Sequence, residues 1–331
     1  MKKIQEAAVL SALQEGRSSA EKKYKQAVKE VSMLNRKLEA VFQLKRKPTT
    51  FTIKPMDFGP SQSCAVMLAS DWHVEEIVEA KAVNGLNSYN PDKAKERATM
   101  YFQRGLRLIK MFQQDTTIKT VVLALLGDFI TNDLHEESAE NNAMPPVEAA
   151  LYAQSLLVSG LEFMLNHSKL NFVVPCTSGN HGRFTHKVHH QKERGHSLEH
   201  FMYKSIEEKF KSEKRIKFMV AEGYHTFLDV FGLTLRLHHG HMVQYHGGIG
   251  GITIPVKKAI AGWNRAKQSD LDCFGHFHQY LDGGSFVANG SMIGYNAYAV
   301  AIKAEYEEPK QMMFLVHAER GKTVVAPILF S

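Results

Sequence analysis

Apolar residues near the start of the chain recur in alternating steps of three and four positions. The members of this seam are apolar or small, with Arg17 the one exception: Leu10, Leu13, Ala20, Tyr24, Ala27, Val31, Leu34, Leu38 and Val41. The repeat predicts helices that pair along a narrow stripe, and Gly16 can divide the segment into two helices. A helical hairpin, a coiled-coil dimer and a degenerate helix-turn-helix all fit. Because Lys47 precedes a proline, we expect a helical extension over 1–46 and a linker over 47–62.

Residues 63–331 have a different pattern, in which apolar runs alternate with amphipathic segments. We expect strands at 64–70, 120–126, 171–178, 226–232 and 233–239, and helices at 91–114, 146–167 and 197–211. Short strands joined by turns are expected in the last fifty residues. This order predicts an α/β domain in which helices layer a sheet.

The charge of the chain is concentrated in the helical extension. Residues 1–50 carry twelve Lys and Arg against five Glu, whereas the remainder has equal numbers of basic and acidic residues, and the whole chain carries +7. A basic extension on a neutral domain favours an anionic partner, with nucleic acid as the first candidate. The alternative is a solvated basic helix without a partner.

Cysteine usage and hydropathy point to a cytoplasmic protein without a membrane partner. Cys64, Cys176 and Cys273 form neither a disulfide framework nor a CxxC zinc site. No apolar run approaches the ~20 residues needed to cross a bilayer. The charged N-terminus is also a poor signal peptide.

Carboxylate, amide and imidazole residues follow one apolar run after another. The segments are "CAVMLASDWH" (64–73), "TVVLALLGD" (120–128), "NFVVPCTSGNHGR" (171–183), "LTLRLHHGH" (233–241) and "DLDCFGHFH" (270–278). Loops at the carboxyl ends of strands hold the sites of open α/β sheets. One such loop is ordinary turn chemistry, but five in succession predict a metal site. Mixed nitrogen and oxygen ligands without thiolate suit Mn²⁺, Fe or Zn²⁺, and their number favours two ions, as in hydrolysis of phosphate esters.

His276 and His278 are separated by one residue in the last of these segments. In a strand they would leave on the same face, because side chains alternate. Alone, the pair is better explained by chance than by metal binding. As the end of the fifth apolar run it favours two metal ligands.

The ordered motifs DWH, GD, GNH, HGH and GHFH, over about residues 62–295, closely resemble those of the calcineurin-like metallophosphoesterases and, more distantly, of double-strand-break-repair nucleases. The resemblance implies a four-layer α/β/β/α sandwich with a dinuclear metal centre at one edge. Its motif positions imply that one ion is held by Asp71, His73, Asp128 and His278, and the other by Asp128, Asn180, His239 and His276. His241 is the alternative to His239.

A hydroxide bridging the ions would attack phosphorus, with His181 as general acid. Mn²⁺ is favoured, with Fe, Zn²⁺ and Mg²⁺ as alternatives.

Two positions depart from the family pattern. Thr131 stands where the family often has Asp or His, and His135 is the nearby candidate substitute. This weakens the repair-nuclease assignment, and the absent GD-x-V-D-R-G motif disfavours a phosphoprotein phosphatase. Gly182 replaces the usual acid after GNH, and Arg183 then offers a guanidinium suited to bidentate phosphate contact. GNHGR variants resemble phage-encoded and bacterial predicted phosphoesterases, which places a phage version in the host cytoplasm.

Two flanking segments carry weaker signals. The basic, His-rich residues 184–196 are interpreted as a path for a phosphodiester or as a mobile basic loop. The Gly-rich residues 245–255 lack a GK[ST] sequence, so we expect a flexible rim or lid instead of a phosphate-binding loop.

These patterns favour a phosphodiesterase or nuclease that acts on nucleic acid, with a homodimer formed through residues 10–41. A phosphomonoesterase or cyclic-nucleotide phosphodiesterase is the alternative within the same class. A non-catalytic nucleic-acid-binding subunit is the alternative from another class, and the intact ligand set argues against it.

Overall fold

In the computed structural model the chain divides into two units, Met1–Asp57 and Phe58–Ser331. The structure describes residues 2–44, 61–134, 136–188, 195–245, 247 and 250–330. The expected linker apart from its last two residues, the candidate His135, and parts of the 184–196 and 245–255 segments lie outside these residues.

The described part of the first unit is a single helix, α1 (Lys2–Leu44). Gly16 lies inside it and does not divide it, so a helical hairpin and a helix-turn-helix within these residues are both excluded. The large seam side chains that the structure describes are more than half exposed, between 52% at Leu38 and 72% at Tyr24. The coiled-coil alternative stays a prediction.

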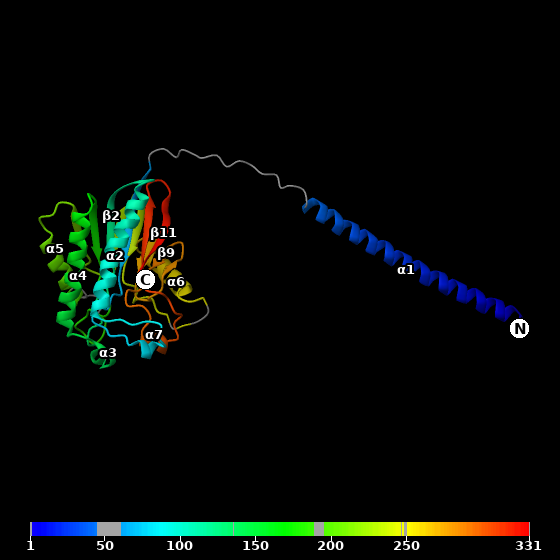
Figure 1. Cartoon of the computed structure of the whole chain (residues 1–331), viewed down its shortest axis with the longest axis horizontal. Coiled ribbons are helices and arrows are strands. Elements are labelled where there is room, and N and C mark those ends of the chain that lie inside the picture. Colours follow the sequence, from blue (N-terminus) through cyan, green and yellow to red (C-terminus); the bar gives the residue numbers. More distant parts are fainter. Residues whose placement is uncertain are drawn as a thin grey trace. The chain divides into compact units, whose positions relative to one another are not determined.

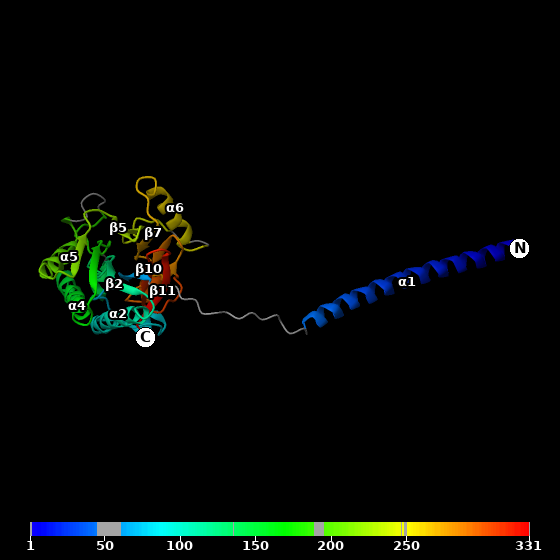
Figure 2. The same cartoon turned by 90° about the horizontal axis from the view of Figure 1, so that it is seen from above.

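Two sheets form the centre of the second unit (Figures 1 and 2). The six-stranded sheet has the order β11-β10-β1-β2-β3-β4, and the five-stranded sheet has the order β5-β6-β7-β9-β8. Strands β1 to β4 are mutually parallel, while β10 and β11 are antiparallel additions at one edge. The strands of the first sheet are β1 (Gln62–Ala69), β2 (Thr117–Leu125), β3 (Asn171–Cys176), β4 (Ile216–Val220), β10 (Lys310–His317) and β11 (Gly321–Leu329). Those of the second are β5 (Thr226–Val230), β6 (Leu233–Leu237), β7 (Leu271–Phe274), β8 (Leu281–Asp282) and β9 (Phe286–Ala288).

Helices cover the outer faces of the sheets. The helices of this unit are η1 (Ala80–Val83), α2 (Pro91–Phe112), α3 (Glu136–Asn141), α4 (Pro146–Asn166), α5 (Leu198–Lys209), α6 (Thr253–Trp263) and α7 (Ala297–Ala301). Figure 2 shows α2, α4 and α5 on the side of the six-stranded sheet and α6 on the side of the five-stranded sheet. The side chain of Asn90 caps α2 by accepting from the Lys93 N–H at 2.9 Å, and Ser197 caps α5.

Three apolar clusters separate these layers. Along β1, Ala65 and Met67 pack in the cluster under α2, α4 and α5, whereas Val66 and Leu68 pack in the cluster between the two sheets. Successive side chains of a strand point to opposite faces. Because β1 is a central strand with a layer on each side, both of its faces are buried. A third cluster lies between the five-stranded sheet and α6. The four-layer α/β/β/α architecture is therefore confirmed.

The predicted strands and helices agree with observed elements to within a few residues. Strand β4 and helices η1, α3, α6 and α7 were not predicted. In the segment 245–255, Thr253 begins α6, so its last residues are helical, and the flexible rim or lid stays a prediction. No helix within the described residues is long and apolar enough to cross a membrane.

Candidate metal centre

The five motif loops meet beside one another because they follow strands that are parallel neighbours in the two sheets. Strands β1, β2 and β3 lie side by side, as do β6 and β7. The backbone joins the first two loops directly: the N–H groups of Asp71 and Trp72 donate to the carbonyls of Gly127 and Asp128 at 3.0 and 2.8 Å. Residues more than 200 positions apart in the chain thus contribute to one buried centre.

The first cluster contains Asp71, His73 and His278, each of which offers one ligand atom within 4.8 Å of the others. Asp71 is completely buried and His73 is 3% exposed. The Nε2 atom of His278 lies 3.4 Å from Oδ1 of Asp71. This cluster takes two side chains from the loop after β1 and one from the loop after β7.

The second cluster contains Asp128, His239 and His276 within the same distance limit. Nδ1 of His239 donates to the carbonyl of Leu126 at 2.6 Å, which turns Nε2 toward Oδ2 of Asp128 at 2.8 Å. The backbone N–H of His276 donates to both carboxylate oxygens of Asp71, at 3.0 and 3.1 Å. The two clusters are therefore directly connected.

Two buried side-chain atoms in these loops lack hydrogen-bond partners among the described residues and are therefore available to bind metal ions. Nε2 of His73 and Oδ1 of Asn180 are buried without a hydrogen-bond partner within the described structure. Buried polar atoms are rarely left in this state unless a ligand completes their interactions. Nδ1 of His73 lies 3.0 Å from the Thr131 hydroxyl, which itself donates to Glu76, so Nε2 retains the lone pair for an ion. Thr131 thus orients the imidazole of the candidate ligand His73.

Five of the candidate ligands have left-handed backbone angles. The φ values are 56° at Asp71, 47° at His73, 55° at Asp128, 68° at His276 and 53° at His278. This conformation is costly for residues other than glycine and is concentrated at functional sites. The prediction that His276 and His278 share a strand face is wrong, because β7 ends at Phe274 and both residues lie in the following turn. That turn directs them to different clusters.

Two motif glycines are required by close contacts. A Cβ atom on Gly179 would lie 2.1 Å from Oδ1 of Asp128, and one on Gly275 would lie 2.3 Å from Oδ2 of Asp71. Each glycine therefore lets a neighbouring loop reach a candidate ligand.

The electrostatic environment keeps most of the candidate ligands in the deprotonated form, which is the form that binds metal. Burial lowers the pKa of both His73 and His276 to about 3, so these imidazoles are neutral at pH 7. Burial disfavours ionised Asp128, but the charge of His239 dominates and holds its pKa well below the usual range. Burial likewise opposes the charged form of His239, yet Asp128 raises the pKa of this imidazole to about 10.

His181 lies at the edge of the first cluster. Its ring centroid is 5.1 Å from that of His73, its Nδ1 lies 2.9 Å from the carbonyl of Thr131, and its backbone N–H donates to Asp128. The contact with the carbonyl holds Nδ1 as the donor and leaves Nε2 for substrate. Its role as general acid stays a prediction.

Two other candidate residues have different surroundings. The guanidinium of Arg183 donates to the backbone carbonyls of Asn180, Thr185 and His186, within its own loop. Both ring nitrogens of His241 are buried and find no hydrogen-bond partner among the described residues, but His239 is the residue that joins the second cluster.

Sequence reasoning missed the buried acids behind these loops. Oε1 of Glu75 accepts the N–H groups of Thr131 and Asn132 at 2.7 and 2.8 Å, and burial raises its pKa to about 7. Burial and the charge of Asp128 raise the pKa of Glu199 to about 8. No motif spacing marked either residue, because each acts on backbone groups of a distant loop.

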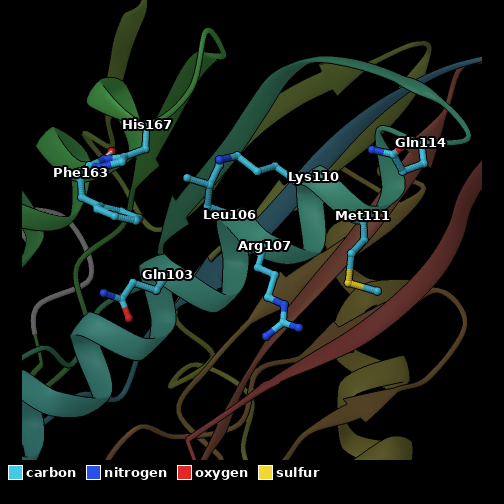
Figure 3. Close-up of a pocket in the computed structure, with 8 residues that line it drawn as sticks. All are labelled: Gln103, Leu106, Arg107, Lys110, Met111, Gln114, Phe163 and His167. Atoms are coloured by element: carbon cyan, nitrogen blue, oxygen red, sulfur yellow. Dashed lines mark hydrogen bonds between the residues drawn. The ribbon is translucent and has the colours of Figure 1, made fainter.

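A separate groove of about 450 Å³ lies between α2 and α4 (Figure 3). Arg107, Lys110 and Met111 line it from α2, and Phe163 and His167 line it from the end of α4. None of the candidate metal ligands lines it, so the groove is distinct from the metal centre.

No family model and no curated protein matches the sequence. Solved structures do match the chain. A conserved uncharacterized protein from Streptococcus pneumoniae, described as a predicted phosphoesterase, is 10% identical at a TM-score of 0.30, and the match covers 77% of this chain and 83% of that one. Vps29 from Entamoeba histolytica, crystallised in complex with Zn²⁺, is 12% identical at a TM-score of 0.27, with 81% and 99% covered. A hypothetical protein from Pyrococcus horikoshii is 11% identical at a TM-score of 0.39, with 81% and 89% covered.

Proposed function

We propose that this chain is a metal-dependent phosphoesterase that holds two divalent ions and hydrolyses phosphodiesters of nucleic acid. The observation that carries the proposal is the pair of connected Asp–His–His clusters, to which the loops of His73 and Asn180 add buried side-chain atoms without hydrogen-bond partners among the described residues. The motif order of the calcineurin-like metallophosphoesterases and the four-layer architecture agree with it.

The side chains divide the work of the reaction. Asp71, His73 and His278 would hold one ion, and Asn180, His239 and His276 the other, with Asp128 between them. When bound, two such ions polarise the phosphoryl group and supply a hydroxide at neutral pH. Nε2 of His181 would deliver a proton to the leaving oxygen, because Nδ1 is held by the Thr131 carbonyl. Mn²⁺ is our preferred metal on the basis of the mixed nitrogen and oxygen ligands.

The substrate class is proposed from the charge of α1. Lys22, Lys25 and Lys29 are exposed on the helix, and residues 1–50 account for the net positive charge of the chain. Nucleic acid releases counterions when lysines neutralise its phosphates, so a basic extension strengthens binding without reading sequence. The homodimer and the cytoplasmic location are part of the same proposal.

One activity panel tests the reaction. The full chain is assayed with Mn²⁺, with and without EDTA, on a chromogenic phosphomonoester, a chromogenic phosphodiester, and single- and double-stranded DNA and RNA. We expect EDTA-sensitive cleavage of the diester and of at least one nucleic acid. Asp128→Asn should abolish it, whereas the exposed control Glu208→Gln should not. Activity on the monoester alone would contradict the nuclease proposal, and inactivity on every substrate would favour the non-catalytic alternative.

Salt dependence tests the role of α1. Replacing Lys22, Lys25 and Lys29 together with Gln should lower the slope of log binding constant against log salt by about 0.9 per lost phosphate contact on duplex DNA. Cleavage of the small chromogenic diester should not change. An unchanged slope for nucleic acid would assign the basic helix to another role.

A further inference from the structure

Glu199 is a buried carboxylate that belongs to neither metal cluster. It lies in the first turn of α5 and is completely inaccessible to solvent. A buried carboxylate is costly unless hydrogen bonds satisfy it. Here Oε1 accepts the N–H of Phe129 at 2.6 Å and Oε2 accepts the N–H of Gly179 at 2.7 Å.

These two N–H groups belong to the loops that carry second-cluster donors. Phe129 directly follows Asp128, and Gly179 directly precedes Asn180. One carboxylate therefore bridges the loop after β2 and the loop after β3. Groups that orient ligands in this way commonly change metal affinity by 10–100-fold when they are removed.

The side chain of Glu199 also occupies the space beside Gly182. The φ angle at Gly182 lies outside the left-handed region, so its backbone does not require glycine. A Cβ atom at Gly182 would nevertheless lie 2.7 Å from Cγ and 3.1 Å from Cδ of Glu199. The backbone N–H of Leu198 donates to the carbonyl of Gly182 at 2.7 Å, which fixes the start of α5 against this loop. A side chain at Gly182 and the side chain of Glu199 exclude each other.

We infer that Glu199 is a positioning residue whose carboxyl group, supplied from α5, replaces the acid missing after the GNH motif at Gly182 and aligns Asp128 with Asn180. The inference rests on the proposed metal-binding function of the two clusters. It explains two departures together: a glycine in place of an acid, and a buried acid for which the described residues provide no ion pair.

An exchange of the two positions tests this inference. The variants are Glu199→Gln, Glu199→Ala, Gly182→Glu and the double variant Gly182→Glu with Glu199→Ala, with Glu208→Gln on the exposed side of α5 as control. Gln keeps the size of Glu199 but presents an NH₂ group to one of the two backbone donors, so one hydrogen bond is lost. Mn²⁺ binding is measured by titration calorimetry, and spin coupling between paired Mn²⁺ ions by electron paramagnetic resonance.

We expect Glu199→Gln and Glu199→Ala to weaken one of the two Mn²⁺ sites by about 10–100-fold and to reduce the coupled signal, while the other site is retained. The double variant should recover coupled Mn²⁺ relative to Glu199→Ala, and Gly182→Glu alone should not match the wild type. Two wild-type sites in Glu199→Gln, or a double variant no better than Glu199→Ala, would overturn the inference. Failure of the unmodified chain to bind Mn²⁺ would instead contradict the proposed function.

Discussion

For His181, one variant can distinguish a role as general acid from a role as metal ligand. Its ring lies beside the first cluster, but its Nδ1 is engaged with the Thr131 carbonyl and its remaining nitrogen faces away from that contact. We expect His181→Ala to reduce kcat by about 10²–10⁴-fold, because a general acid contributes on that scale, while two Mn²⁺ ions remain bound. Kinetics and calorimetric Mn²⁺ titration check this prediction. A lost ion would show that His181 is a ligand.

His239 and His241 provide a matched pair at the same motif. His239 contributes a candidate ligand atom to the second cluster, whereas the ring nitrogens of His241 have no partner within the described part of the chain and belong to neither cluster. We expect His239→Ala to eliminate one of two bound Mn²⁺ ions and His241→Ala to retain both. Metal content after gel filtration, measured by inductively coupled plasma mass spectrometry, distinguishes the two. Equal losses in both variants would contradict this division.

At the scale of elements, α1 combines an apolar seam with a basic outer face. Val31 and Leu34 lie in the seam and are 56% and 55% exposed, while Lys22 and Lys29 lie opposite the seam in a heptad repeat. A helix of this length with an exposed apolar stripe is stabilised when a second copy covers the stripe. The basic face would then stay free for nucleic acid.

We therefore expect Val31→Asn with Leu34→Asn to convert a dimer of the full chain to a monomer. Sedimentation velocity measures the change, and the outer-face variant Lys22→Gln with Lys29→Gln is the control that should remain dimeric. A monomeric wild-type chain at micromolar concentration would contradict the dimer.

At the scale of the whole molecule, the metal centre joins the two sheets. The first cluster combines Asp71 after β1 with His278 after β7, and the second combines Asp128 after β2 with His239 after β6. Ions that bind only the folded arrangement stabilise it by mass action, by about 2.7 kcal/mol for one site at a hundredfold excess over Kd. We expect Mn²⁺ to raise Tm and EDTA to reverse the change.

This stabilisation should increase with pH. Burial opposes protonation of His239, but Asp128 raises its pKa from 6.5 to about 10, so at pH 7 an ion must displace a proton from this imidazole. Between pH 6.5 and 9, Mn²⁺ affinity should rise by about tenfold per pH unit for each displaced proton. Without metal, the raised pKa stabilises the fold below about pH 6.5, and this contribution is lost as pH rises through 10. Titration calorimetry at pH 6.5 and 8, in buffers of different ionisation enthalpy, measures the proton release. A Mn²⁺ affinity that does not change with pH would contradict this account.

Much of the fold and of the centre was predictable from sequence because the relevant signals are local. The two-residue burial period of strands such as β1, and the helical segments after Asn90 and Ser197, are encoded in consecutive residues. Likewise, Asp71, Asp128 and Asn180 were recognisable as candidates because each follows an apolar strand whose carboxyl end must reach the same edge.

The resemblance assigned His276 and His278 to different ions, and the tertiary structure shows by which local geometry the two side chains separate. His276 and His278 reach different clusters because β7 ends before them and both have left-handed backbone angles, which the alternation of a strand could not predict. Glu199 accepts hydrogen bonds from the backbone N–H groups of Phe129 and Gly179. Because nearly every residue has a backbone N–H, the sequence does not mark these two, and only the packing of α5 brings them within reach of Glu199. The residue types and their order determine which functional groups are available and which faces of the strands and helices are buried. The pairing of loops depends on strand order, turn conformation and close backbone contacts, and these are properties of the folded chain.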